Sequence, residues 1–108
     1  MLNIVNVMAD DGMAIVSASL GENHAESMME QTRARLVDWA ASAIPDGIEA
    51  QLHVVRGTVY DQILRTATEL GVGGIFVGAH RPALKDYLIG PNAARVARHA
   101  TQSVFVIR

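Results

Sequence analysis

The stretch GIFVGAHRPALKDYLIGPNAARVARHATQSVFVIR, residues 74–108, decides the fold class. It begins with an apolar run that ends in Gly78, continues through a polar loop to Gly90, and closes with a short helical pattern and a second apolar run. Such apolar runs are typical of parallel strands that are covered on both faces. A loop between a strand end and a helix start is where α/β proteins hold phosphates, because the first N–H groups of a helix lack partners and its macrodipole favours an anion.

Strands and helices alternate along the rest of the chain as well. Apolar runs bounded by glycine, proline and aspartate predict the strands, and apolar residues spaced by three and four predict the helices. We expect strands at residues 2–8, 49–55, 74–78 and 104–107, and helices at 24–43, 58–70 and 92–99. This order, β-α-β-α-β-α-β, predicts an α/β fold with a parallel sheet and right-handed crossovers.

Each predicted helix has one apolar face. The faces are expected to hold Met28, Thr32, Leu36, Trp39 and Ala43 in the first helix, Tyr60, Ile63, Leu64, Ala67 and Leu70 in the second, and Ala93, Val96 and Ala97 in the third. We expect these faces to pack against the sheet.

Length and composition predict one globular domain, residues 1–108, and exclude several classes of function. Half of the 108 residues are apolar and 19% are charged. The net charge of −2 provides no basic surface for nucleic acid and no polybasic membrane anchor. The absence of cysteine excludes disulfides and thiolate catalysis. The apolar residues 1–8 lack a positively charged flank and are too short to span a membrane, so we expect a cytoplasmic protein.

Several segments from residue 48 onward carry a recognisable pattern. They are Arg56-Gly57-Thr58, the strand at 74–78, the block Gly78-Ala79-His80-Arg81-Pro82, and residues 87–100 and 103–108. Together they resemble the universal stress protein family, because loop, helix and terminal strand match in order and spacing. The first 47 residues match loosely. The resemblance implies a parallel-sheet, Rossmann-like domain of the adenine nucleotide alpha hydrolase-like type.

The nucleotide motif of that family is glycine, two residues, glycine, nine residues, and glycine followed by serine, threonine or asparagine. Gly78 matches the first glycine and Gly90 the last. Arg81 stands at the middle glycine, and only eight residues separate it from Gly90. Pro91 replaces the residue whose hydroxyl usually meets a phosphate, and Asn92 follows it. This shorter loop resembles a variant branch of the family that is also associated with ATP binding.

The resemblance implies that ATP or a related adenine nucleotide binds at this loop, with or without Mg²⁺, in a regulatory role with little or slow hydrolysis. The residues implied in binding are Val7, Gly78, Ala79, His80, Arg81, Gly90, Pro91, Asn92 and Ala93. Val7 corresponds to a backbone contact with the adenine.

The same residues also have structural interpretations. Gly78 and Gly90 fit a strand end and an ordinary turn, Arg81 fits a solvated loop charge, and Asn92 fits a helix N-cap. The four histidines lack metal-ligand spacing, and no Ser-His-Asp arrangement is visible, so no metal site and no catalytic residue is predicted. The alternative function is therefore a protein-interaction or regulatory module of the same fold that has lost the nucleotide, with Pro91 as its signature.

The family resemblance implies a strand order similar to 3-2-1-4-5, in which residues 2–8 correspond to the second strand. The first strand and its helix have no counterpart, so the domain is expected to be truncated by one βα unit between the strands at 2–8 and 74–78. The chain is then a fragment, or the sheet closes over the gap, or a partner fills it. We expect the isolated chain to be less stable than one that carries an upstream strand and helix.

The terminal strand predicts how the chain assembles. Its apolar, β-branched residues would lie at a sheet edge, and bare edges of this kind pair with another chain. The resemblance implies an antiparallel, two-fold pairing there. We therefore expect a homodimer through Ser103 to Arg108, together with a regulatory protein partner that the sequence does not identify.

Overall fold

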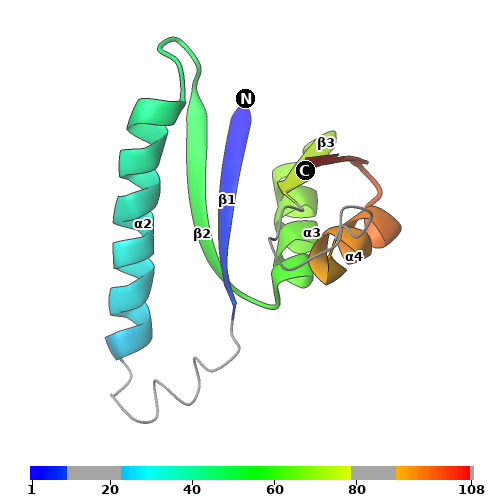
Figure 1. Cartoon of the computed structure of the whole chain (residues 1–108), viewed down its shortest axis with the longest axis horizontal. Helices are drawn as coiled ribbons and strands as arrows, with labels where there is room; N and C mark the ends of the chain where they lie inside the picture. Colours follow the sequence, from blue (N-terminus) through cyan, green and yellow to red (C-terminus); the bar gives the residue numbers. More distant parts are fainter. Residues whose placement is uncertain (10–22, 79–89, 108) are drawn as a thin grey trace. The chain divides into compact units, whose positions relative to one another are not determined.

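The computed structural model describes residues 1–9, 23–78 and 90–107 (Figure 1). The chain divides into two compact units, residues 1–58 and 59–108. The elements are β1 (Leu2–Ala9), α2 (Asn23–Ala43), β2 (Ala50–Gly57), α3 (Val59–Leu70), β3 (Gly74–Gly78), α4 (Pro91–His99) and β4 (Ser103–Ile107). The predicted alternation of strands and helices is confirmed, and every predicted boundary lies within two residues of the observed one.

The first unit contains two long parallel strands joined through α2. β1 and β2 pair along their whole length, from Leu2 opposite Ala50 to Ala9 opposite Gly57. Parallel neighbours need a crossover connection, which α2 supplies. The helix is fixed to the sheet by buried Leu36 and Ala40, and the Arg33 guanidinium donates a hydrogen bond to the Leu52 carbonyl at 3.2 Å.

The two strands of this unit are also joined by a side-chain hydrogen bond. His53 Nε2 lies 3.0 Å from Asn3 Oδ1, and both side chains are partly buried. An amide oxygen only accepts, so His53 donates from Nε2. This bond holds the β1–β2 register from the side chains as well as from the backbone.

The second unit has a short parallel sheet covered by two helices. β3 pairs with β4 from Gly74 opposite Ser103 to Gly78 opposite Ile107. The core consists of Ala67 from α3, Ile75 from β3 and Val96 from α4, and Val96 is fully buried. Partly buried residues pack around it, namely Tyr60, Ile63, Leu64, Val72, Ala100 and Val104. The predicted inward faces of these two helices are confirmed, except for Ala97, which is exposed.

The described strands pair in two sheets, one within each unit. Among residues 1–9, 23–78 and 90–107, β1 pairs only with β2 and β3 only with β4. The unpaired edges of β1 and β3 are those between which the family order places the strand that has no counterpart in this sequence. Within the described residues each sheet thus has two strands, and the helices packed against it, α2 in the first unit and α3 and α4 in the second, supply the support that so small a sheet needs in water.

The expectation that β3 is covered on both faces is wrong. Ile75 is buried, but Phe76 on the opposite face is 72% exposed. Phe76 stacks on Phe105 of β4, with ring centroids 4.5 Å apart and planes 12° from parallel. Both helices of this unit pack on the Ile75 face, so within the described residues only the two rings shield each other on the other side. The apolar run alone did not reveal this asymmetry, because burial depends on what lies against each face.

None of the helices in the described part of the chain is both long and apolar enough to cross a bilayer.

Candidate functional site

The first part of the candidate site lies in the second unit, at the end of β3 and the start of α4. Gly78 is the last residue of β3, and it is exposed. Among the described residues, apart from Gly78 and its chain neighbours, no heavy atom lies within 4 Å of the position that a Cβ would take at Gly78. The described part of the second unit therefore leaves space beside the backbone at this strand end.

Gly90 has a conformation that depends on its being glycine. It is the N-cap of α4, with φ 84° and ψ 158°. This region is essentially restricted to glycine, since a side chain there would be strained. The Gly90 carbonyl accepts the first helical hydrogen bond, from the Ala94 N–H at 3.1 Å. The glycine thus turns the chain into the helix without placing a side chain over its N-terminus.

The interpretation of Asn92 as a helix N-cap is wrong. Gly90 occupies the cap, Pro91 the first helical position and Asn92 the second. Proline suits the first position because its φ is already helical and no intrahelical acceptor is available there for an N–H. The helix consequently starts one residue before the predicted start at Asn92. Asn92 is half-buried, and the side chain of Ala93 is buried.

The electrostatics of α4 favour an anion at its N-terminus. The first turn of α4 contains no acidic residue, and no side chain of the described residues makes a capping hydrogen bond to it. The first turns of α2 and α3 contain Glu26 and Asp61, respectively. Arg98 and His99 lie in the last turn of α4, where they match the negative end of the macrodipole. The positive end of α4 is therefore not neutralised by its own side chains.

The remaining candidates of the loop lie outside the described residues. They are Ala79, His80 and Arg81. The structure places Gly78, at the end of β3, and Gly90, Pro91, Asn92 and Ala93, at the start of α4, in the same unit, on either side of residues 79–89.

Val7, the candidate adenine contact, lies in β1 of the first unit. The Leu2 N–H donates to the Glu49 carbonyl next to β2, at 3.4 Å. Backbone N–H and C=O groups alternate in direction along a strand, so Ile4, Asn6 and Met8 also point toward β2. The backbone groups of Val7 therefore point to the edge of β1 that faces away from β2. This orientation is the one that a backbone contact with a ligand requires.

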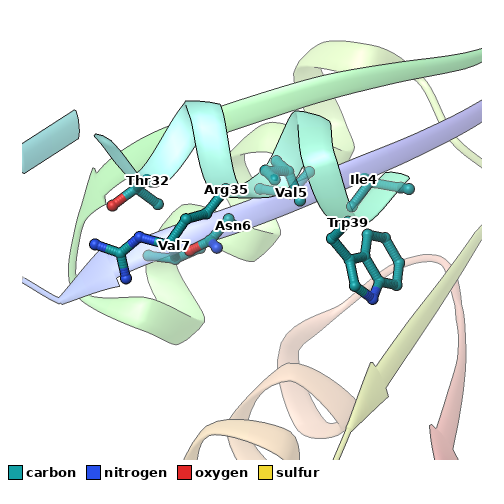
Figure 2. A pocket seen from close by; sticks show the side chains of 8 residues that line it. Ile4, Val5, Asn6, Val7, Thr32, Arg35 and Trp39 are labelled. Atoms are coloured by element: carbon teal, nitrogen blue, oxygen red, sulfur yellow. The ribbon is translucent and has the colours of Figure 1, made fainter. Parts of the chain in front are cut away.

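A groove of about 500 Å³ runs between β1 and α2 in the same unit (Figure 2). Its walls are Ile4, Val5, Asn6 and Val7 from β1, and Thr32, Arg35, Leu36 and Trp39 from α2. Trp39 is 53% exposed. The spacing of apolar residues predicted Trp39 on the apolar face of its helix, and it did not predict the groove. The signal was present in the spacing of Thr32, Arg35 and Trp39 by three and four residues, which puts them on one flank of α2.

Within the described residues, no group of three or more histidine, cysteine, aspartate or glutamate side chains lies close enough together to hold a metal ion.

Comparison with known proteins identifies the family. The family model of the Universal stress protein family matches residues 2–108. The chain belongs to the universal stress protein family. It is 31% identical over 83 residues to Universal stress protein G of Shigella flexneri and equally to that of Escherichia coli O157:H7. The matched region is 77% of this chain and 58% of each relative, so this universal stress protein spans less than two thirds of their length.

Solved structures share the fold of this universal stress protein. The structure of hypothetical protein MJ0577 superposes with a TM-score of 0.80 at 19% identity, covering 97% of this chain and 73% of that one. A universal stress protein solved in complex with cAMP superposes with a TM-score of 0.56 at 19% identity, covering 99% and 72%. The predicted parallel α/β, Rossmann-like fold of the family is thereby confirmed.

Proposed function

We propose that this universal stress protein binds ATP or a related adenine nucleotide through the loop between β3 and α4, and that it acts as a regulator in the stress response. The observation that carries the proposal is Gly90, whose glycine-only conformation places no side chain of its own over the start of α4, in a helix whose first turn has no acidic residue. A phosphate is the anion that such a helix start best accommodates. That a member of the same family was solved with cAMP supports an adenine nucleotide as the ligand.

The proposal assigns a role to each candidate residue. Gly78, Ala79 and Gly90 allow close backbone approach to the phosphates, and the N–H groups of Asn92 and Ala93 face the anion at the helix start. Arg81 contributes a bidentate contact to a phosphate, with His80 beside it. The Val7 backbone contacts the adenine, and Mg²⁺ accompanies the nucleotide.

Pro91 determines how tightly we expect the nucleotide to bind. At the position after the last glycine, the family usually offers a backbone N–H and a hydroxyl to a phosphate, and proline offers neither. A hydrogen bond to a charged group contributes about 1.5–3 kcal/mol, so one lost donor weakens binding by about 10–100-fold. We therefore expect ATP binding that is measurable but weak.

Isothermal titration calorimetry with ATP and Mg²⁺ tests the proposal on the parent and on three variants. Pro91→Ser restores both the N–H and the hydroxyl, and should tighten binding by about 10-fold or more. Pro91→Ala restores the N–H alone and is the matched control that separates the two donors. Gly90→Val should abolish binding, because valine cannot adopt φ 84° without strain and would cover the helix start.

Two outcomes would contradict the nucleotide proposal. The absence of heat with both the parent and Pro91→Ser would favour the alternative, a protein-interaction module of the same fold. Equal binding by the parent and Gly90→Val would show that the nucleotide sits elsewhere. Phosphate release in the same samples checks the expectation of at most slow ATP hydrolysis.

We further propose that residues 1–108 work as one cytoplasmic domain and form a homodimer through Ser103 to Arg108. The free edge of β4 supports the dimer, since within the described residues β4 pairs only with β3. Phe105 and Ile107 are 48% and 54% exposed, which provides apolar surface for an isologous contact.

A further inference from the structure

A cation of the second unit lies on the flank of α4 that leads to the helix start. Arg95 is the fifth residue of α4, and Pro91 is the first. Residues four apart on a helix share one flank, and side chains lean toward the helix N-terminus. The Arg95 side chain therefore covers the turn between Pro91 and its own Cα, rather than the turn that follows it.

Arg95 is supported by Tyr60, the second residue of α3. The carbon at the centre of its guanidinium lies 4.8 Å from the centroid of the Tyr60 ring. The ring is partly buried and packs against the core cluster, whereas Arg95 is exposed. A long cationic side chain normally loses rotamer freedom when it binds a ligand. Because the contact with Tyr60 already restricts that freedom, Arg95 is pre-organised for binding.

The pair of Arg95 and Tyr60 lies toward the same edge of the second sheet as the candidate site. β3 and β4 are parallel, and both helices pack on one face of their sheet. α3 ends shortly before β3 begins, and α4 ends shortly before β4 begins. The C-termini of both helices therefore lie at the amino edge of the sheet, and their N-termini lie toward the carboxyl edge. Gly78 ends β3 at that carboxyl edge.

The charge of Arg95 is not neutralised by any carboxylate that the structure describes. Its contact is with an aromatic ring, and no described aspartate or glutamate side chain lies within ion-pair distance of it. The sequence of α4, PNAARVARH, contains no acidic residue. A guanidinium presents its donors in a plane that matches two oxygens of a phosphate. An anionic ligand at the start of α4 would therefore meet two positive groups, the helix N-terminus and Arg95.

We propose that Arg95, positioned by Tyr60, binds a phosphate of the nucleotide and makes the site selective for ligands with more than one phosphate. This inference rests on the proposed binding of an adenine nucleotide at the start of α4. A phosphate held by the first N–H groups lies in front of the helix end, whereas Arg95 lies on its flank, with its Cα about 6 Å along the axis from that of Pro91. A single phosphate occupies the first of these places, and a second phosphate of the same ligand extends to the other. Arg95 thus offsets the contact that Pro91 cannot make, and it favours ATP over AMP.

Calorimetric titration of the full 108-residue chain with ATP, AMP and inorganic triphosphate tests this inference. The parent should bind ATP more tightly than AMP. Arg95→Gln should weaken the binding of ATP and of inorganic triphosphate by about 10-fold or more, and should change AMP binding by less than about 2-fold. Inorganic triphosphate carries no adenine, so it isolates the phosphate contact. Arg98→Gln is the matched control, because Arg98 is an exposed arginine in the last turn of the same helix, and its loss should change all three affinities by less than about 2-fold.

Two variants test the positioning role of Tyr60. Tyr60→Leu removes the ring and should weaken ATP binding by about 2- to 5-fold without a matching loss for AMP. Tyr60→Phe keeps the ring and should bind both nucleotides as the parent does. The ratio of the ATP affinity to the AMP affinity is the readout, because a general loss of structure would weaken both ligands alike. Circular dichroism confirms that the variants keep the fold of the parent.

The role of Arg95 is overturned if Arg95→Gln binds ATP and inorganic triphosphate as tightly as the parent, or if it weakens AMP binding as much as ATP binding. Either result leaves the nucleotide proposal standing as long as the parent binds ATP. Binding of inorganic triphosphate that depends on Arg95, without binding of ATP or AMP, would support the phosphate contact and contradict the adenine nucleotide as its ligand. A parent that binds none of the three ligands would overturn both proposals.

Discussion

The two units bury their apolar residues to different degrees. In the second unit, residues from α3, β3 and α4 meet in one cluster around the fully buried Val96. In the first unit, only Leu36 and Ala40 are buried among the described apolar residues, although its strands are longer. The first unit has the more extensive backbone ladder and the second has the better side-chain core.

This difference shows which unit has strands that are covered by helices and which has strands that are less covered. A parallel sheet is normally covered and paired on all sides, because its apolar strands have no polar face. The second unit reaches this condition on one face of β3 and β4, where both helices pack. Among the described residues of the first unit, no strand pairs with the second edge of β1, and a groove lies beside α2. We infer that the first unit depends more strongly on an additional segment.

The sharpest test of this comparison introduces a carboxylate into each unit. Val96→Asp should reduce the free energy of unfolding by on the order of 4 kcal/mol or more, because the charge would be enclosed by Ala67 and Ile75. Leu36→Asp should cost less, on the order of 2 kcal/mol, since Leu36 lines the open groove and a carboxylate there can reach water.

Urea unfolding followed by far-UV circular dichroism measures both losses, and the emission of Trp39 reports the first unit separately. Val37→Asp is the control, because Val37 is 46% exposed on the same helix and its replacement should change stability by at most about 0.5 kcal/mol. Equal losses in the free energy of unfolding for Val96→Asp and Leu36→Asp would show that Leu36 is as well enclosed in the first unit as Val96 is in the second.

The next largest effect is expected from completing the first unit. A strand and helix fused upstream of Met1 should raise both the urea midpoint and the slope, because more surface becomes buried on folding. Full burial of a large apolar side chain contributes about 1.5–3 kcal/mol, so covering Trp39 alone predicts a gain of that order. The control carries a proline in the middle of the added strand. Equal midpoints and slopes would mean that the chain completes its sheet unaided.

The sequence predicted the elements well and their surroundings less well. The order of strands and helices follows from local spacing, and so do the inward positions of Ala93 and Val96. Local spacing failed for Trp39 and Phe76, which are apolar but exposed, because burial depends on elements that a single segment does not specify. The interpretation of Asn92 failed for another reason. Gly90 adopts a positive φ that moves the cap, and composition alone does not reveal that conformation.

The candidate site also has a part that the sequence predicted and a part that it did not. Gly78 and Gly90 were predicted from a family pattern, and the structure places them at a strand end and a helix cap. The groove beside α2 was not predicted, since its residues belong to two elements that are distant in sequence.

A smaller effect is expected at the edge of β4, where the dimer is proposed. The Ser103 N–H donates to the Gly73 carbonyl at 3.3 Å, so the N–H groups of Val104 and Val106 point away from β3. Val106→Pro therefore removes a donor from the free edge alone. In a two-fold interface the change acts twice, which predicts a loss of about 2 kcal/mol and a dimer about 30-fold weaker.

Light scattering over a dilution series measures how strongly the dimer dissociates. Phe105→Pro is the matched control, because the Phe105 N–H points toward β3 and its loss should lower stability as well as assembly. If Val106→Pro stays as dimeric as the parent, the chains meet at another surface.

The smallest effect concerns the contact that joins α3 to α4 inside the second unit. The Arg95 guanidinium lies over the Tyr60 ring, 4.8 Å from its centroid. Arg95 is exposed and Tyr60 partly buried, so their cation–π contact should contribute about 0.5–1 kcal/mol. Tyr60 also packs against the core, and its loss alone would mix the two contributions. A double-mutant cycle with Arg95→Met, Tyr60→Leu and the double variant isolates the coupling energy by urea unfolding. A coupling near zero would mean that the two helices are held by the apolar core alone, and that the greater closure of the second unit owes nothing to this contact.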